Sequence, residues 1–141
     1  MTADHLARRV ADCLHAREGT GPAWNIEIED VREGTARVAM VVREDMINGH
    51  GICQGGLVTA LADSCFAFAC NAYDEVTVAS GFDVDLVAPG RLGDVLTARA
   101  VEVNKSGRLG VYDVEVRNQR DERVCVFRGR SYTMKGKPVV A

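Results

Sequence analysis

The sequence predicts an α+β domain in which a curved antiparallel β-sheet wraps around one long buried helix. Residues 55–71 form an apolar stretch that is too long for one strand and contains residues that favour helix. Several β-favouring segments follow it, separated by short turns. A helix that is apolar on almost every side must be covered on most faces, so the strands are expected to curve around it. The 141 residues suit one domain, 1–141.

The chain is expected to begin with an amphipathic helix over residues 2–17, because apolar residues recur there at spacings of three and four. Thr2 and Asp4 can cap its N-terminus, and Gly19 and Gly21 are expected to end it.

A β-hairpin is predicted from residues 24–30 and 35–42, with its turn at Glu33-Gly34, and an ordered loop from residues 43–54. The remaining strands are expected at residues 76–87, 95–103, 109–116 and 124–134. Turns between them are predicted at Pro89-Gly90, Ser106-Gly107 and Asp121-Glu122.

Composition and charge narrow the class of protein. The formal net charge is -3, so the sequence lacks the strongly basic balance of a nucleic-acid-binding protein. Charges interrupt the first residues every few positions, which argues against a signal peptide. The apolar stretch is shorter than the roughly 20 residues of a membrane span and contains Asp63. We therefore expect a cytoplasmic protein with neither a nucleic-acid nor a membrane partner.

The five cysteines are expected to be reduced thiols, because their odd number and the lack of a C-x-x-C pair do not suit a disulfide framework. The three histidines, His5, His15 and His50, show no metal-ligand spacing with them. We expect neither a metal nor another cofactor. Cys53 is interpreted as a packing residue rather than a nucleophile.

A glycine pair, Gly55-Gly56, opens the apolar helix. Glycine allows a ligand to approach the backbone closely, and the first turn of a helix offers unpaired N–H groups and a partial positive charge. Such a turn can bind the oxygen of a thioester carbonyl. The alternative is that the two glycines do no more than form a tight turn into the helix.

Asp63 stands in the middle of the same helix. A buried carboxylate without a partner is costly, so it needs a partner or a function. It can act as a general base on water or attack a thioester directly, and the sequence leaves both open. Two structural alternatives are a local hydrogen bond with Thr59 and exposure on a narrow polar stripe that includes Thr59.

The spacing within the helix indicates a dimer. Eight residues separate Gly55 from Asp63, which corresponds to about 12 Å along a helix axis. One helix cannot readily bring both groups to the same carbonyl. Two antiparallel helices related by a two-fold axis can do so, with Asp63 of one subunit facing Gly55 of the other. We expect a homodimer with shared active sites, paired into a homotetramer.

A family resemblance is carried by residues 48–71, which read NGHGICQGGLVTALADSCFAFACN. This stretch resembles the PaaI-type hotdog thioesterases, whose pattern is N-G-H-x-x-x-H-G-G followed by L-A-D-x-A-F-A-x-A-x-N. The likeness extends through VASGFDVDLVAPGRLGD, GVYDVEVRNQ and VFRGRSY, and so spans residues 43–133. It implies the hotdog fold and hydrolysis of acyl-coenzyme A (acyl-CoA), with phenylacetyl-CoA or its ring-hydroxylated forms as the expected substrates.

The resemblance also implies roles for particular residues. Asp63 corresponds to the catalytic carboxylate, Gly55 to the glycine whose N–H polarises the carbonyl, and Asn48 to the residue that organises substrate and water. Gly56 adjoins the bound carbonyl, and Ser80 is the candidate for positioning the water.

Phe66 is a candidate for contacting the acyl group, with core packing as the alternative. Lys105, Arg108, Arg128 and Arg130 are candidates for contacting the phosphates of coenzyme A, with simple solvation as the alternative.

The sequence departs from the family pattern at Gln54, which replaces the motif histidine. Glutamine donates hydrogen bonds but cannot transfer a proton near neutral pH. His50 is the nearest candidate to replace that histidine, with stabilisation of its own loop as the favoured alternative. The departure keeps an alternative open, in which the protein binds acyl-CoA without hydrolysing it. A hotdog dehydratase ranks last, because the apolar helix contains no histidine.

Overall fold

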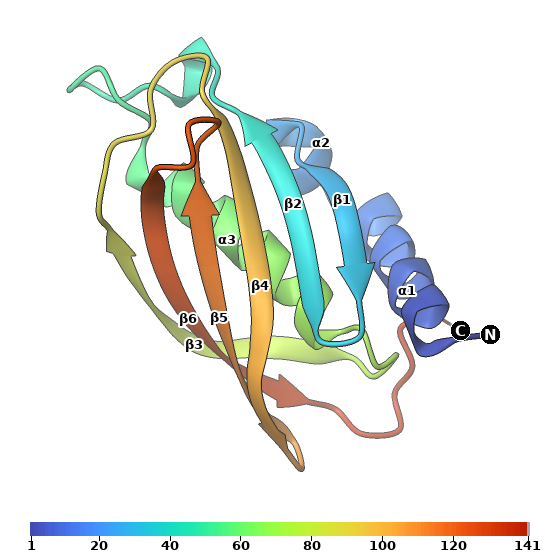
Figure 1. The fold of residues 1–141 in the computed structure, drawn as a ribbon. Helices are drawn as coiled ribbons and strands as arrows, with labels where there is room; N and C mark the ends of the chain where they lie inside the picture. The colour runs from blue at the N-terminus through green and yellow to red at the C-terminus, as the bar shows by residue number, and fades with distance from the viewer. Residues whose placement is uncertain (141) are drawn as a thin grey trace.

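The computed structural model describes residues 1–140 (Figure 1). Its helices are α1 (Ala3–Arg17), α2 (Thr20–Trp24) and α3 (Gly55–Cys70), with a short 3-10 turn, η1 (Glu44–Met46). Its strands are β1 (Glu27–Arg32), β2 (Thr35–Val41), β3 (Thr77–Leu86), β4 (Val95–Ser106), β5 (Leu109–Arg117) and β6 (Arg123–Thr133). Within the described residues, these strands form one antiparallel sheet in the order β1-β2-β4-β5-β6-β3.

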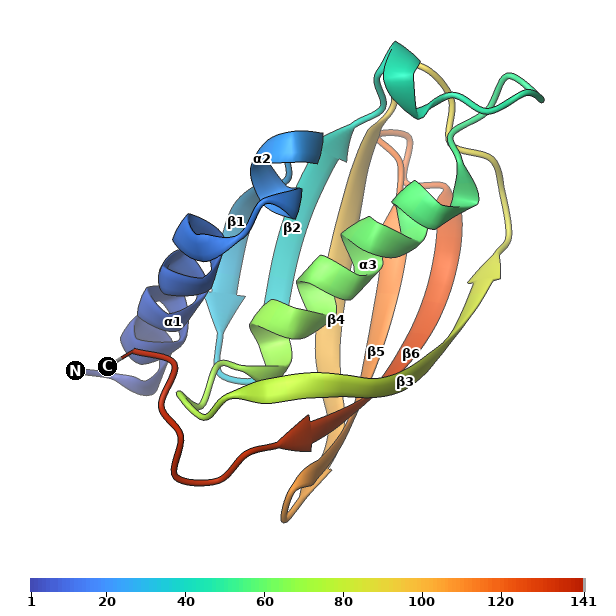
Figure 2. The same ribbon diagram turned by 180° about the vertical axis from the view of Figure 1, so that it is seen from behind.

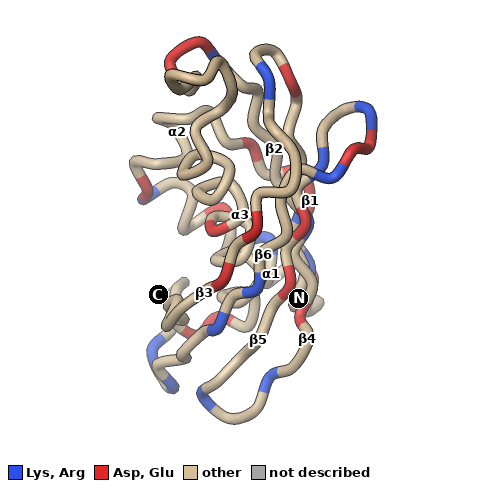
Figure 3. Tube along the Cα trace, turned by 90° about the vertical axis from the view of Figure 1, so that its left-hand side faces the viewer, with Lys and Arg blue, Asp and Glu red and all other residues tan. Residues whose placement is uncertain are grey.

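The sheet curves around α3, which lies across its concave face (Figure 2). The helix contacts every strand and buries eight of its 16 residues, among them Leu61, Cys65 and Phe66. Figure 3 shows α3 almost free of charged residues, whereas charges are frequent along the strands and loops. The predicted α+β fold with a curved sheet around a buried helix is confirmed. None of the helices in residues 1–140 has the length and hydropathy that a membrane span requires.

The N-terminal helix forms as predicted and packs against β1. The Thr2 side chain caps it by accepting a hydrogen bond from the His5 N–H at 3.1 Å. Three small apolar residues on its inner face, Ala7, Val10 and Ala11, are fully buried. This face covers the β1 end of the sheet, next to α3.

Helix α1 ends at Arg17 as predicted, but the segment that follows it differs from the prediction. Gly21 does not end a helix but lies within α2, and Trp24, expected in a strand, is the last residue of α2. Asn25 then adopts the left-handed conformation with φ 52°, which asparagine tolerates, and ends the helix. Strand β1 begins at Glu27. A five-residue helix is too short to produce a recognisable helical period, so sequence periodicity could not reveal it.

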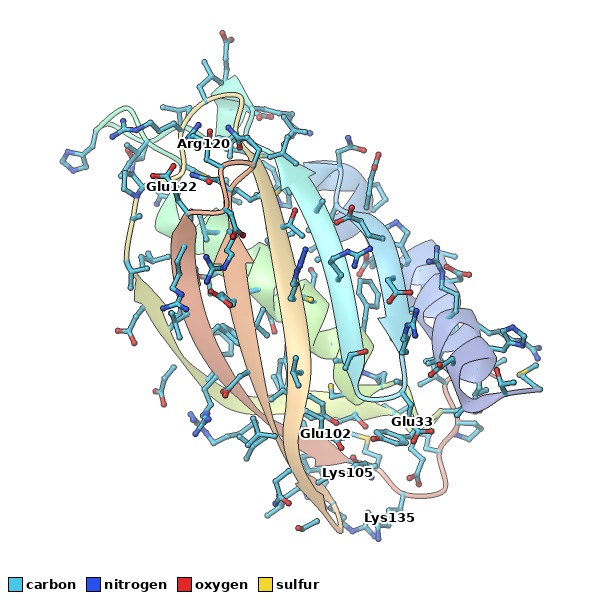
Figure 4. All side chains as sticks on the ribbon, in the orientation of Figure 1. Glu33, Glu102, Lys105, Arg120, Glu122 and Lys135 are labelled. Carbon is cyan, nitrogen blue, oxygen red and sulfur yellow. The ribbon has the colours of Figure 1, made fainter. Side chains whose placement is uncertain are left out.

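The C-terminal end of α3 is tied to the sheet by Glu102 of β4, which Figure 4 labels near the lower end of the sheet. Its carboxylate accepts hydrogen bonds from the Tyr73 hydroxyl at 2.8 Å and from the Tyr112 hydroxyl at 2.9 Å. Tyr73 follows α3 and Tyr112 lies on β5, so one carboxylate joins three segments. Burial and this carboxylate raise the pKa of the Tyr112 hydroxyl.

Close packing between β6 and α3 gives a first prediction. A Cβ atom at Gly129 would lie 2.8 Å from Cζ of Phe66, which is closer than van der Waals contact allows. We expect Gly129→Ala to lower the free energy of unfolding by about 1–3 kcal/mol, because the core must shift to accept the methyl group. Urea unfolding monitored by circular dichroism measures this loss.

Gly49→Ala is the matched control, because its Cβ would have no atom within 4 Å. Adding Phe66→Leu to Gly129→Ala should recover part of the loss, since the ring is the obstacle. A Gly129→Ala protein as stable as the parent would contradict the tight packing.

Candidate functional site

The first turn of α3 offers two unpaired donors. Gln54 is the N-cap residue, and its carbonyl accepts the N–H groups of Leu57 at 2.9 Å and Val58 at 3.3 Å. The N–H groups of Gly55 and Gly56 find no acceptor within residues 1–140. Both point out of the positive end of a 16-residue helix, where an oxygen with developing negative charge is stabilised.

The loop before α3 is folded by Asn48. Its side-chain oxygen accepts the N–H groups of His50 at 2.9 Å and Ile52 at 3.3 Å, and its own N–H donates to the Ile52 carbonyl at 2.8 Å. The Cys53 N–H donates to the Gly90 carbonyl at 2.8 Å, which holds the loop against the turn between β3 and β4. Asn48 therefore shapes the entrance to α3, while its side-chain NH₂ finds no acceptor among residues 1–140.

A groove of about 630 Å³ opens beside this loop. It brings together three of the predicted site residues, Asn48, His50 and Gly55. The exposed side chain of Gln54 adjoins it in sequence and forms no capping hydrogen bond in the described chain. The groove extends to the turn between β3 and β4, where Arg91 lines it.

Arg91 is a further candidate for contacting the phosphates of coenzyme A, and it was not among the residues singled out from the sequence. Its position was a usable signal, because it directly follows the predicted Pro89-Gly90 turn. Two of the arginines considered for the phosphates are instead held in ion pairs on exposed strands. Arg128 binds Asp113 through two contacts of 2.6 and 2.8 Å, and Arg130 contacts Asp83 at 3.1 Å.

Asp63 lies two turns beyond Gly55 and does not line this groove. It is half-buried, and burial raises the pKa of its carboxyl group. Within residues 1–140 we find no hydrogen bond or ion pair to this carboxylate. The Thr59 hydroxyl donates to the Gly55 carbonyl at 2.8 Å, so the alternative of an Asp63–Thr59 hydrogen bond is wrong. A threonine within a helix commonly satisfies its hydroxyl in this way.

A narrow stripe on α3 remains partly uncovered in the single chain. We define the α3 stripe as four residues at helical spacing: Gly56, Ala60, Asp63 and Ala67. Three of them are small, so another backbone can approach the carboxylate closely. Thr59 is also half-buried, so the alternative of a partly exposed polar stripe agrees with the single chain.

Ser80 and Phe66 lie apart from the groove at the start of α3. Ser80 occupies a β-bulge on β3, and its hydroxyl donates to the Arg130 carbonyl at 3.2 Å. Phe66 is fully buried, with its ring centroid 5.6 Å from that of Tyr112 and 5.8 Å from that of Phe127. The proposed roles of Ser80 toward water and of Phe66 toward the acyl group stay predictions.

The cysteines are free thiols. Cys53 is buried at the edge of the groove, and burial raises the pKa of its thiol. A raised pKa disfavours the thiolate, which agrees with the packing role expected for this residue. Among the described residues, no group of three or more His, Cys, Asp or Glu side chains is placed to hold a metal ion.

The burial of Asp63 predicts how stability depends on pH. Burial raises the folded-state pKa above that of the unfolded chain, so proton binding favours folding, and stability falls as pH rises through the raised pKa. Asn at this position cannot ionise. We expect Asp63→Asn to be more stable than the parent at neutral pH, with the difference shrinking as the pH falls toward the ordinary carboxyl range, about 3.9.

Thermal unfolding of both proteins between pH 4 and 8 measures this difference. Asp85→Asn, at an exposed carboxylate of β3, is the control and should show a smaller change. A stability difference for Asp63→Asn that is constant over this range would contradict the burial argument.

The chain is similar to known thioesterases in sequence and in structure. Residues 50–125 match the family model of the thioesterase superfamily. The chain is 39% identical over 132 residues to the acyl-coenzyme A thioesterase PaaI of Escherichia coli K12, covering 94% of each chain.

Two solved structures are also similar. The structure of the E. coli PaaI protein from the phenylacetic acid degradation operon has a TM-score of 0.94 at 38% identity, covering 96% of this chain and 99% of that one. A hypothetical thioesterase from Streptococcus pneumoniae, solved with coenzyme A, has a TM-score of 0.77 at 26% identity, covering 80% of this chain and 88% of that one. The chain therefore belongs to the thioesterase superfamily, and within it to the PaaI-type hotdog thioesterases.

Proposed function

We propose that this protein hydrolyses acyl-CoA thioesters to a free acid and coenzyme A, with phenylacetyl-CoA or ring-hydroxylated phenylacetyl-CoA as substrate. The observation that carries the proposal is one helix with both required groups: unpaired N–H donors at its positive end and a desolvated carboxylate in its apolar middle. The E. coli relative is named an acyl-coenzyme A thioesterase, and it is described as a protein from the phenylacetic acid degradation operon. The S. pneumoniae structure contains coenzyme A.

The proposed reaction begins when the thioester carbonyl oxygen accepts the N–H of Gly55. The unpaired N–H groups of the first turn of α3 stabilise the negative charge that develops on the carbonyl oxygen during attack. The Asp63 carboxylate removes a proton from the attacking water, and the C–S bond breaks to release coenzyme A thiolate. Alternatively, the carboxylate attacks the carbonyl itself and expels coenzyme A thiolate as the C–S bond breaks, and water then hydrolyses the resulting anhydride. Either route requires ionised Asp63, so activity should fall when this group is protonated.

The two groups can meet only across a dimer. Gly55 and Asp63 of one helix lie about 12 Å apart along its axis, so we propose that α3 pairs with an antiparallel copy in a second subunit. Three of the four residues of the α3 stripe are small, so the backbone of a second helix can approach it closely. Its neighbour β3 is an edge strand within residues 1–140 and exposes Val78, Phe82 and Leu86. Exposed apolar edges of this kind typically pair with another chain.

We further propose that dimers pair into tetramers. The outer face of the sheet exposes Val101, Val103 and Val126 on β4 and β6, which provides an apolar area that such pairing would cover.

We propose that Gln54 donates a hydrogen bond near the thioester sulfur rather than a proton. Its exposed side chain stands at the N-cap of α3, directly before the oxyanion donors. Coenzyme A leaves as a thiolate, which requires less help from a proton donor than an alkoxide does. We therefore propose that the replacement slows turnover without abolishing it.

An acyl-CoA panel with a coupled thiol assay tests the function. We expect thiol release by the parent protein, with the highest kcat/KM for arylacetyl thioesters, and its loss in Asp63→Asn by at least about 100-fold. Equilibrium binding of phenylacetyl-CoA by Asp63→Asn should persist, because the substitution keeps the size of the side chain.

Two results would contradict this assignment. An Asp63→Asn protein with the parent rate would exclude Asp63 as the catalytic carboxylate. Binding of acyl-CoA without thiol release by the parent would instead indicate a non-catalytic acyl-CoA-binding protein.

Subunit complementation tests the shared site. Gly55→Pro removes one N–H donor at the first helical position, where the helical backbone accepts proline, and should lower kcat by about 100-fold. A Cβ at this position meets Cδ1 of Leu86, so the Leu86 side chain must move in either variant. Gly55→Ala is the matched control, because it adds the same Cβ and keeps the N–H. Mixing Gly55→Pro with Asp63→Asn after reversible dissociation should restore up to roughly a quarter of parent activity, since each mixed dimer has one intact site. No recovery, despite mixed dimers detected by mass spectrometry, would contradict a shared site.

A further inference from the structure

Two turns meet at the end of the sheet where α3 begins (Figure 1). The β3–β4 turn comprises residues 87–94, and its Arg91 lines the groove at the start of α3. The β5–β6 turn comprises residues 118–122, and Figure 4 labels Arg120 and Glu122 within it. A contact between these turns therefore connects a part of the sheet outside the groove with a residue that lines it.

Asp94 joins the two turns. Its side chain is only 6% exposed, and both of its oxygens are used. One oxygen accepts the Arg91 N–H at 2.9 Å, which closes the β3–β4 turn, and the other accepts a side-chain N–H of Gln119 at 2.9 Å. The Arg120 guanidinium lies 3.7 Å from the second oxygen. Burial disfavours the charged carboxylate, but the hydrogen bonds from Gln119 and Arg91 hold the pKa of Asp94 below its usual value.

Gln119 is fixed in the orientation that this contact requires. Its side-chain oxygen accepts the Val95 N–H at 3.0 Å, so its NH₂ group faces Asp94. The β5–β6 turn that carries Gln119 is folded by Asn118, whose side-chain oxygen accepts two later N–H groups of the turn at 3.0 Å each. One side chain of the β5–β6 turn therefore contacts both the last residue of the β3–β4 turn and the first residue of β4.

The guanidinium of Arg91 remains available for a ligand. Asp94 holds this residue through its backbone N–H. Among the described residues, the exposed Arg91 side chain takes part in no hydrogen bond or ion pair. The β3–β4 turn also contacts the loop before α3, because the Gly90 carbonyl accepts the Cys53 N–H at 2.8 Å. The turn thus presents a free cation to the groove from a fixed backbone.

We propose that Asp94 and Gln119 are positioning residues, which hold Arg91 where its guanidinium meets the phosphate groups of a coenzyme A thioester. This inference rests on the proposed function and extends it to two residues that do not touch the substrate. With the turn fixed, Arg91 loses only side-chain freedom when it binds a phosphate. With the turn free to open, it would lose backbone freedom as well, and binding would weaken.

Two substrates separate this role from a general effect on folding. An acyl-CoA carries the phosphates, whereas the acyl-pantetheine with the same acyl group presents the same thioester without them. We define the preference ratio as kcat/KM for the acyl-CoA divided by kcat/KM for the acyl-pantetheine. Arg91→Ala should lower this ratio about tenfold, mainly through the KM of the acyl-CoA, because it removes charge-assisted hydrogen bonds to phosphate. Asp94→Asn should lower it about fivefold, because an amide presents one oxygen to the two donors that Asp94 accepts.

The Arg91→Ala background tests whether Asp94 acts through Arg91. In that background, Asp94→Asn should lower the preference ratio no further, whereas two independent effects would add. Asp121→Asn is the matched control, because it makes the same exchange at an exposed carboxylate of the β5–β6 turn, outside the groove. It should leave the ratio unchanged.

A reversed hydrogen bond tests the contact between the two turns. When Asp94→Asn is combined with Gln119→Glu, the new amide can donate to the new carboxylate, whose second oxygen can still accept the Val95 N–H. This double variant should recover most of the preference ratio that Asp94→Asn loses. Gln119→Ala alone should lower the ratio, and its exposed position keeps the test informative if circular dichroism shows that Asp94→Asn does not fold.

The outcomes separate this inference from the proposed function. Equal losses for the two substrates in Asp94→Asn and Gln119→Ala, or additive losses in the Arg91→Ala background, would overturn the positioning role. An unchanged preference ratio in Arg91→Ala would overturn it as well. Failure of the parent to release thiol from any acyl-CoA would instead overturn the proposed function. Equilibrium binding of coenzyme A relative to pantetheine, by the parent and Asp94→Asn, would still decide the positioning role.

Discussion

Desolvation of one carboxylate inside an apolar helix is the constraint on which the rest of this structure depends. The sheet can wrap around α3 because eight of the helix residues are buried and its sides are almost free of charge. Asp63 is the exception, and burial raises the pKa of its carboxyl group. The chain offers this group no partner within the described residues. Its stabilisation must therefore come from water, from substrate or from a second subunit, and each of these connects the fold to its chemistry.

The same arrangement separates two requirements that conflict. The proposed catalysis requires a negative charge on Asp63 in a poorly solvated position, whereas folding favours removal of that charge. The fold confines the conflict to one stripe of α3, and the core behind it is formed by apolar side chains such as Leu61 and Phe66. The cost of the carboxylate is thus local, and the wrapped sheet does not have to accommodate it.

The main elements could be predicted from sequence because their signals are long. The apolar stretch of α3 and the β-favouring segments extend over many residues, and glycine and proline mark the turns between them. Helix α2 could not be predicted, because its five residues are too few to show a helical period. The β-bulges, such as the one at Ser80, were also beyond prediction, because a bulge depends on how two strands pair rather than on either strand alone.

The part of the candidate site that depends on one helix could be proposed from sequence, whereas contacts that depend on the folded chain could not. The Gly55-Gly56 pair and Asp63 stand out within one helix, so their chemistry could be inferred locally. The hydrogen bond of Thr59 could not, since threonine can bond either a backbone carbonyl or a neighbouring side chain. The groove between α1, the C-terminal half of α3 and the segment after β6 could not be predicted, because segments far apart in the sequence form it and the segment with Val139 has no recognisable pattern.

The position of Gln54 has a consequence for how this enzyme family can diverge. Its side chain is exposed and forms no capping hydrogen bond in residues 1–140, while its backbone alone starts the first turn of α3. Folding therefore places little restriction on the amino acid at this site. Under the proposed function, the side chain at this position affects only the departure of the thiol product, so an imidazole can be exchanged for an amide without any compensating change in the scaffold.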